Sequence, residues 1–227
     1  MSLFKEAKAQ DRKILTEIEA KNVLRAGGIP VVETVLAKSK EESQMLASNL
    51  GFPVVLKVCS PHIVHKTDMG GVFLDLTNVE EVGNAYEKIM KTVIAQYPGA
   101  DIKEVAVQKM VSEGVEVVVG MSRDPQFGPL IMFGLGGIFV EIMKDVSFRV
   151  VPLSEADAWE MISEIKGKAL LEGVRGTSPV NKEALIDIII KLSNLVEENP
   201  EMKELDINPL FVNSKDAIVA DARIILE

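Results

Sequence analysis

The sequence of 227 residues lacks several features that would each indicate a particular class of protein. It contains a single cysteine, Cys59, which excludes an intrachain disulfide framework and a zinc site built from cysteines. No apolar run approaches the roughly 20 residues needed to span a membrane. The polar residues 1–13, charged in both signs, are unlike a signal peptide. We therefore expect a soluble, cytoplasmic protein, and the apolar setting of Cys59 favours a buried, unreactive thiol.

Charge narrows the choice of partner. Acidic residues exceed basic ones, 34 against 25, giving a net charge of −9, which argues against a broad nucleic-acid footprint. A nucleotide is still compatible with this charge, because a divalent cation and a few lysines can neutralise its phosphates locally. Apolar residues make up 47% of the chain, enough for one large domain or two smaller lobes.

The pattern of apolar and turn-forming residues predicts a small mixed lobe over residues 27–107. Its predicted order is strand, helix, strand, strand, helix, strand. Ser39 with Glu42, and Thr77 with Glu80, have the spacing of capping boxes at the starts of the two helices.

The rest of the sequence predicts a larger lobe, formed by residues 1–26 and 108–227. Ser154 with Asp157 predicts the start of one helix, and a second helix with a long apolar stripe follows Asn181. Strands are expected at residues 115–121, 129–133, 139–142 and 148–153. No proline-rich linker separates the lobes, so we expect a single α/β domain of mixed type, residues 1–227, with a cleft between its lobes.

The most informative segment is a predicted hairpin near the C-terminus, with a tight turn at residues 213–216. With two central turn residues, the register places Asn208 opposite Asp221, with side chains roughly 5 Å apart. Asp206 lies on the same face of its strand. An amide oxygen and a carboxylate arranged in this way suit Mg²⁺, which keeps several waters and bridges phosphates. The polar outer face of an edge hairpin explains the local pattern equally well.

A lysine and a polar loop follow the apolar strand at residues 53–58. Lys57 lies near the end of this strand, where a buried ammonium needs an anion. A phosphate is the favoured partner, and a carboxylate is the alternative. The loop, residues 60–71, ends in Gly70 and Gly71, which allow close backbone approach to a ligand and offer amides to phosphate oxygens.

The same loop contains both histidines of the chain. We expect His62, which follows a proline, to brace the loop. His65 is the stronger candidate, because neutral imidazole predominates near pH 7 and is a competent nucleophile toward phosphorus. Lys66 beside it would provide a counter-charge for a phosphorylated ring. A hydrogen-bonded loop histidine without chemistry explains the local pattern as well.

Further candidates lie in the larger lobe. Residues 135–138 resemble a second turn built for close backbone approach. Glu116, in a strand, could accept hydrogen bonds from ribose hydroxyls or simply face water, and Arg149 could reach the cleft or lie on the surface. No Ser–His–Asp arrangement or Walker-type phosphate loop is present in the sequence.

Several segments together resemble one known family. They are residues 54–57, 65–72, 123–129, 134–137 and 204–210. In order, and over nearly the whole chain, they are similar to the ATP-grasp subunit of ADP-forming acetyl-CoA (acyl-CoA) synthetases, which are related to succinyl-CoA synthetase. The resemblance implies an ATP-grasp fold, with the nucleotide in the cleft between two lobes.

The resemblance also implies an activity, with ATP/ADP and Mg²⁺ as cofactors. In this family acyl-CoA, ADP and phosphate are converted reversibly to the carboxylate, CoA and ATP. An alpha subunit carries the CoA-binding and phosphohistidine domains, and its phosphoryl group passes to a histidine of the beta subunit and then to ADP. This chain has no segment that matches the alpha region, so we expect a separate beta subunit in an α2β2 assembly.

Residue roles follow from the same resemblance. His65 matches the histidine of the beta subunit, and Asp206 matches the acidic residue that steadies the phosphorylated ring. Asn208 and Asp221 match the residues that hold magnesium. The expected nucleotide contacts are Lys57 with the loop glycines Gly70 and Gly71 at the phosphates, Gln108 and Val111 at the adenine hinge, and Glu116 at the ribose.

Two other functions remain open. A stand-alone ATP-grasp carboxylate ligase would act through an acyl phosphate made directly from ATP, and it has no need for His65. A non-catalytic nucleotide sensor would regulate a partner acyltransferase. The presence of Lys57, His65, Asn208 and Asp221 together makes a sensor the less economical explanation.

Overall fold

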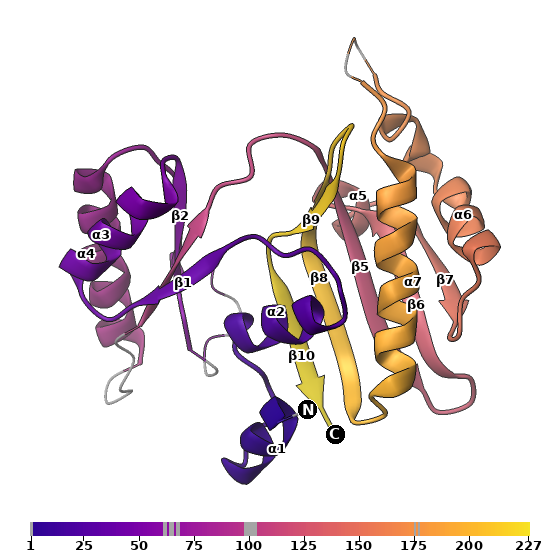
Figure 1. Ribbon diagram of the computed structural model, residues 1–227, viewed down its shortest axis with the longest axis horizontal. Coiled ribbons are helices and arrows are strands. Elements are labelled where there is room, and N and C mark those ends of the chain that lie inside the picture. Colours follow the sequence, from indigo (N-terminus) through magenta and orange to yellow (C-terminus); the bar gives the residue numbers. More distant parts are fainter. Residues whose placement is uncertain are drawn as a thin grey trace. The chain divides into compact units, whose positions relative to one another are not determined.

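A computed structural model describes most of the chain: residues 2–60, 63, 66, 69–97, 104–174, 176 and 178–227. The chain divides into two compact units, of which unit 1 is Met1–Val31 with Val111–Glu227 and unit 2 is Val32–Met110. Figure 1 shows the elements of both units coloured along the sequence. Within the described ranges, no helix has both the length and the apolar character needed to cross a membrane.

Unit 2 is an antiparallel sheet backed by helices. Its strands are β1 (Thr34–Ala37), β2 (Val54–Val58), β3 (Val72–Leu76) and β4 (Val105–Lys109), and its helices are α3 (Lys40–Leu50) and α4 (Val79–Gln96). The strands pair in the order β1-β4-β2-β3. Because every residue of β2 is buried, the apolar run that predicted this strand lies at the centre of the unit. The predicted order of strands and helices is confirmed.

The starts of the two helices in unit 2 differ from the predicted capping boxes. Ser39 caps α3 as predicted, accepting from Glu42 N at 3.1 Å, but the Glu42 carboxylate accepts from Lys38 N rather than from Ser39 N. At α4 the predicted pair is wrong by one residue. Asn78 is the N-cap and accepts from Glu81 N at 2.9 Å. Amide side chains cap as well as hydroxyls do, so the second of two adjacent polar residues caps this helix.

Unit 1 contains the larger sheet. Its strands are β5 (Val115–Asp124), β6 (Gly128–Leu135), β7 (Val146–Val150), β8 (Met202–Val212), β9 (Ala217–Val219) and β10 (Ala222–Leu226). They pair antiparallel in the order β10-β8-β5-β6-β7, and β9 also pairs with β8. The central strands β5 and β8 therefore lie next to each other although they are far apart in the sequence.

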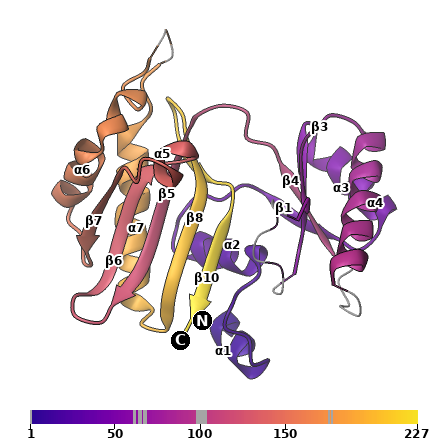
Figure 2. The same cartoon turned by 180° about the vertical axis from the view of Figure 1, so that it is seen from behind.

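Helices α6 (Glu155–Glu164) and α7 (Lys182–Glu198) pack on one face of this sheet, as Figures 1 and 2 show. The helical segments are α1 (Ser2–Ala9), α2 (Glu17–Ala26), α5 (Ile138–Glu141), α6 (Glu155–Glu164), the 3-10 helix η1 (Lys166–Leu170) and α7 (Lys182–Glu198). The predicted starts of α6 and α7 at Ser154 and Asn181 are confirmed. The predicted strand at residues 139–142 is wrong, because that segment begins with the short helix α5. We call the sheet face away from α6 and α7 the far face.

Candidate functional site

The C-terminal hairpin has the predicted register. The Asn213 N–H donates to the Asp216 carbonyl at 3.0 Å, and the Asn208 N–H donates to the Asp221 carbonyl at 3.2 Å. Two residues further along the strands, Asp206 is paired with Arg223. Asn208 therefore lies opposite Asp221, as the length of the turn predicts.

Four polar side chains of this hairpin share the far face of the sheet. On β8 the residues on either side of Asp206 are buried among the core, whereas Asp206 is half-buried and Asn208 is exposed. Arg223 is likewise half-buried between two buried residues of β10. Since alternate residues of a strand face opposite sides, Asp206, Asn208, Asp221 and Arg223 all point away from α7. We call these four residues the polar quartet.

A bulge in β8 exposes Asn208. Val117 of β5 is opposite Leu210, but Val119, two residues on, is opposite Ile207, so β8 contains one extra residue there. Both Ile207 and Leu210 are consequently fully buried, and Asn208 between them is directed outward. Bulges commonly re-aim side chains next to functional sites.

The electrostatics of the polar quartet favour a bound cation. Burial raises the pKa of Asp206, Arg223 acts to lower it and the nearby Asp221 charge raises it further, so the net pKa is above the ordinary value. Two carboxylates that repel each other are relieved by a positive ion between or beside them. The donor set of Asn208 and Asp221, one amide oxygen and one carboxylate, suits a hard ion such as Mg²⁺.

The chemistry of this site fits an ion that arrives with its ligand. Within the described ranges, no group of three or more histidine, cysteine, aspartate or glutamate side chains could hold a metal. Asn208 and Asp221 alone would leave most coordination positions of Mg²⁺ to water and phosphate oxygens. Mg²⁺ in nucleotide sites is usually bound in this way, through one or two carboxylates plus substrate phosphates.

Two predicted nucleotide contacts lie in the sheet of unit 2. Lys57 is only 6% exposed and Gln108 only 2%. Lys57 pairs in register with Val72 and Ala106, so its backbone is fixed on both sides. Thr34 Oγ1 lies 3.4 Å from Gln108 Oε1, to which it donates. A buried residue with a paired backbone can hold a ligand group in a fixed position. The contacts of Lys57 and Gln108 with a nucleotide stay predictions.

The two loop glycines have different reasons for being glycine. Gly70 is exposed and has φ 71°, a left-handed conformation that disfavours other residues. At Gly71 a Cβ would lie 2.7 Å from Val58 Cγ1. The Gly71 N–H donates to the Lys66 carbonyl at 2.8 Å, so the expectation that this amide is free for a phosphate is wrong.

Both histidines, including the candidate His65, lie outside the described residues, and the role of His65 stays a prediction. Glu116 is exposed on β5 and Val111 is half-buried.

The predicted close approach at residues 135–138 occurs within the protein itself. Gly136 donates to the Glu116 carbonyl at 2.8 Å, and a Cβ there would lie 3.0 Å from Glu116 Cβ.

Arg149 has a structural role on the surface. Its guanidinium donates from Nη1 to Glu164 Oε2 of α6 at 3.0 Å and from Nη2 to Glu160 Oε2 at 3.2 Å. Cys59 is only half-buried, so the expectation of a buried thiol is wrong.

Arg223 was not among the sequence candidates. Its signal was its spacing, two residues after Asp221, which places both side chains on one face of a strand.

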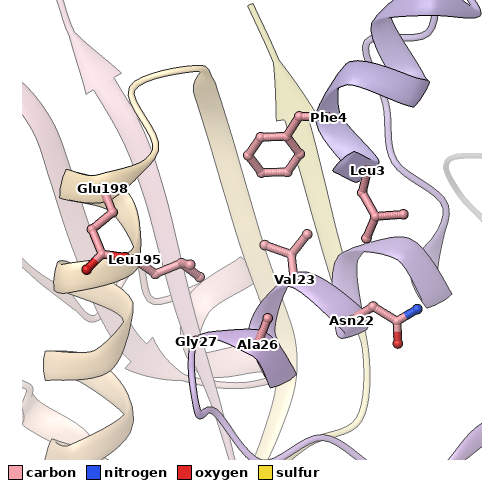
Figure 3. A pocket seen from close by; sticks show the side chains of 8 residues that line it. All are labelled: Leu3, Phe4, Asn22, Val23, Ala26, Gly27, Leu195 and Glu198. Atoms are coloured by element: carbon pink, nitrogen blue, oxygen red, sulfur yellow. The ribbon is translucent and has the colours of Figure 1, made fainter. Parts of the chain in front are cut away.

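A separate surface pocket of about 280 Å³ lies within unit 1. As Figure 3 shows, it is bordered by side chains from α1, α2 and α7. Most of its lining is apolar, and it includes none of the predicted site residues. The lining residues are Leu3, Phe4, Asn22, Val23, Ala26, Gly27, Leu195 and Glu198.

Comparison with known proteins shows which protein family the chain is similar to. The ATP-grasp domain family matches residues 6–226. The beta subunit of acetate–CoA ligase [ADP-forming] I of Pyrococcus furiosus is 51% identical over 99% of this chain and 96% of its own length. The beta subunit of form II from the same organism is 45% identical, over 100% of this chain and 98% of its own.

Solved structures agree over the full length. The dinucleotide-forming acetyl-coenzyme A synthetase 1 of Ca. Korarchaeum cryptofilum, in complex with coenzyme A, Ca-AMPCP and HgCl⁺, matches with a TM-score of 0.96 and 49% identity, covering 100% of this chain and 99% of that one. The same enzyme with coenzyme A and Mg-AMPPCP, its phosphohistidine segment pointing towards the nucleotide binding site, matches with a TM-score of 0.86 and 46% identity, with the same coverage. The chain belongs to the ATP-grasp family, among the beta subunits of ADP-forming acetate–CoA ligases. The predicted fold and family are confirmed.

Proposed function

We propose that this chain is the nucleotide-binding beta subunit of an ADP-forming acetate–CoA ligase. The reaction converts acyl-CoA, ADP and phosphate to the carboxylate, CoA and ATP. Identity of 51% over 99% of the chain to a beta subunit with this activity carries the proposal. The partner is an alpha subunit with the CoA-binding and phosphohistidine domains, in an α2β2 complex that works in the cytoplasm.

Asn208 and Asp221 hold the Mg²⁺ that accompanies the nucleotide. Support comes from their cross-strand position on the far face of unit 1 and from the repulsion between Asp206 and Asp221. A structure of a related enzyme in complex with Mg-AMPPCP supports a magnesium nucleotide as the ligand. The ion held there would supply positive charge to neutralise the phosphates.

The other nucleotide contacts keep the roles that the family resemblance implies. Lys57 and Gly70 serve the phosphates, Gln108 and Val111 the adenine, and Glu116 the ribose. Lys57 and Gln108 suit their roles because both are buried in a paired sheet of unit 2.

His65 receives the phosphoryl group, and Asp206 steadies the phosphorylated ring. The bond from phosphorus to the alpha-subunit histidine breaks as a bond to His65 forms, and an oxygen of the ADP terminal phosphate then displaces His65 to give ATP. Such transfer depends on positioning and charge neutralisation more than on covalent side-chain chemistry. A His65→Ala complex should keep labelled phosphate on the alpha chain and lose it from the beta chain. Label on the beta chain of that variant would exclude the relay through His65.

The metal assignment is tested by nucleotide binding to the isolated chain. Asn208→Ala and Asp221→Ala should each weaken binding of Mg-ADP about tenfold or more, measured by calorimetry, because a metal ligand is lost. Binding of ADP in excess chelator should be the same in both variants as in the wild type. Asn194→Ala, which removes an exposed amide on α7, is the matched control. Unchanged Mg-ADP affinity in both site variants would remove the assignment.

A second assay separates the alternative functions. The chain is incubated with ADP, acetyl-CoA and phosphate, with and without a candidate alpha subunit, and ATP formation is followed. ATP that forms only with the partner supports the beta-subunit role. Acyl phosphate made from ATP and a carboxylate by the isolated chain would instead show a stand-alone ligase. Nucleotide binding without turnover under either condition would favour the sensor.

A further inference from the structure

Arg223 occupies a position in the polar quartet that the proposed function leaves without a role. It is paired in register with Asp206, and both side chains lie on the far face. A half-buried arginine beside a proposed phosphoryl-transfer residue is well placed to contact the group transferred.

The charges of the quartet show what Arg223 adds. Asp206 and Asp221 are both acidic, Asn208 is neutral, and Arg223 is the single basic member. With Mg²⁺ bound at Asn208 and Asp221, the two carboxylates would cancel the charge of the ion. Arg223 then supplies the net positive charge that faces the phosphates. A transferring phosphoryl group spreads negative charge over three oxygens, which need this compensation.

The pairing of Arg223 with Asp206 indicates which phosphate Arg223 reaches. The pair Asp206–Arg223 lies two residues from the pair Asn208–Asp221, a separation of roughly 7 Å along a strand. Asp206 is proposed to steady the ring that carries the transferred phosphoryl group, so its cross-strand partner Arg223 lies beside the terminal phosphate of the nucleotide. A guanidinium presents a planar fork of donors that matches phosphate oxygens.

We propose that Arg223 is a phosphate-binding residue, whose guanidinium donates hydrogen bonds to the terminal phosphoryl group of the nucleotide beside Asp206. This inference rests on the proposed function and deepens it, because it names which part of the nucleotide the far face of unit 1 recognises. The alternative is that Arg223 only neutralises Asp206. These two roles make different predictions for nucleotides of different length.

The test compares AMP, ADP and AMPPCP, each with Mg²⁺, by calorimetry on the full chain. Arg223→Met should weaken AMPPCP binding roughly ten- to a hundredfold, the range for losing hydrogen bonds to a charged group. The loss should be smaller for ADP and less than about twofold for AMP. Arg223→Lys, which keeps the charge but not the fork, should fall between wild type and Arg223→Met. Arg149→Met is the matched control, because it removes an arginine from the opposite face of the same sheet.

A second cycle separates phosphate binding from neutralisation of Asp206. The Arg223→Met loss is measured again in an Asp206→Asn background, where there is no carboxylate to neutralise. A loss for AMPPCP that persists there supports the proposal. A loss that disappears there overturns it and leaves Arg223 as a neutralising residue.

Three further outcomes would each be decisive. Equal weakening of all three nucleotides, with a lower melting midpoint, overturns the proposal in favour of a structural role. Unchanged AMPPCP affinity in Arg223→Met, with normal binding by the wild type, overturns this inference alone. A wild-type chain that binds none of the three nucleotides overturns the proposed function together with it.

Discussion

Glu19 forms hydrogen bonds that connect the start of α2 to the preceding residues Arg12 and Thr16. We call this set of contacts the junction, and Glu19→Gln tests its contribution to stability. Arg12 donates to both oxygens of the Glu19 carboxylate, at 2.9 and 2.8 Å, and the Thr16 N–H donates to it at 2.8 Å. The Glu19 N–H donates in return to Thr16 Oγ1. Leu15, just before this capping box, donates to the Ile224 carbonyl, so the junction ties α2 to the hairpin strand β10.

The expected loss of stability is moderate. Hydrogen bonds to a charged group are worth roughly 1.5–3 kcal/mol, but partly exposed ion pairs are worth about 1 kcal/mol or less. The Glu19 and Arg12 side chains are each 21% exposed, so the combined loss in Glu19→Gln should be about 1–2 kcal/mol. For a chain of this size that lowers the melting midpoint by roughly 2–8 °C.

The difference should depend on pH. Burial acts to raise the pKa of Glu19, but hydrogen bonds from Arg12 and Thr16 outweigh it and lower the pKa below the ordinary 4.5. A carboxyl whose pKa is lowered by folding adds stability above its unfolded pKa, and that stability is lost as the pH falls through the folded pKa. The gap between wild type and Glu19→Gln should therefore be constant near pH 7 and close below pH 4.5.

Thermal melts followed by circular dichroism at several pH values provide the measurement. Glu197→Gln, an exposed glutamate of α7, is the matched control and should change stability by less than about 0.5 kcal/mol. A Glu19→Gln melting midpoint equal to that of the wild type at pH 7 would show that the junction adds nothing. A gap that stays constant into acid would show that the carboxylate charge is not its source.

Two further substitutions test the packing of unit 1. Gly167→Ala would place a Cβ 2.3 Å from Leu135 Cδ1 in the core, and we expect a destabilisation of roughly 1–3 kcal/mol, measured by chemical denaturation; a wild-type midpoint would contradict the tight contact. Ser193→Ala removes the acceptor of the buried Leu153 N–H, at 2.9 Å, and should destabilise by about 1–2 kcal/mol. Ser163→Ala on the exposed side of α6 is its control, and an equal effect in both serine variants would contradict the role of burial.

Much of the candidate site could be predicted because its geometry is local. The number of residues in the turn fixes the register of a hairpin, and the register alone places Asn208 opposite Asp221. The buried strand β2 was equally clear, since a continuous apolar run bounded by turn residues has few alternatives. Ser154 and Asn181 cap helices because their side chains satisfy backbone groups within three residues.

The errors arise where the decisive contact is remote or where two local signals overlap. Thr77 and Asn78 are adjacent and both can cap, so one residue separates the predicted start of α4 from the observed one. Helix α5 has only four residues, three of them apolar, which is too few to distinguish a helix from a strand by periodicity. Helix α1 was missed because its sequence is polar apart from residues such as Phe4, whose burial depends on distant partners.

The glycines show the same limit for function. Gly71 and Gly136 looked like turns made for a ligand, but each is close to the protein's own atoms, Val58 and Glu116. These contacts join segments far apart in the chain, and no sequence spacing reveals them. Arg223 was missed because an arginine at an alternate position of a strand usually only faces solvent. Its importance depends on the residue paired with it across the strands, Asp206.

The inserted position of unit 2 has a consequence for biosynthesis. Unit 1 is built from two stretches of chain on either side of unit 2, joined where Ile14 bridges Ile225 and Val31 bridges Val219. The ribosome therefore synthesises all of unit 2 before strands β9 and β10, against which the N-terminal segment with α2 packs. Unit 2 can therefore fold co-translationally. The apolar side of α2 stays uncovered until the strands it packs against are synthesised, which makes it a target for a nascent-chain chaperone.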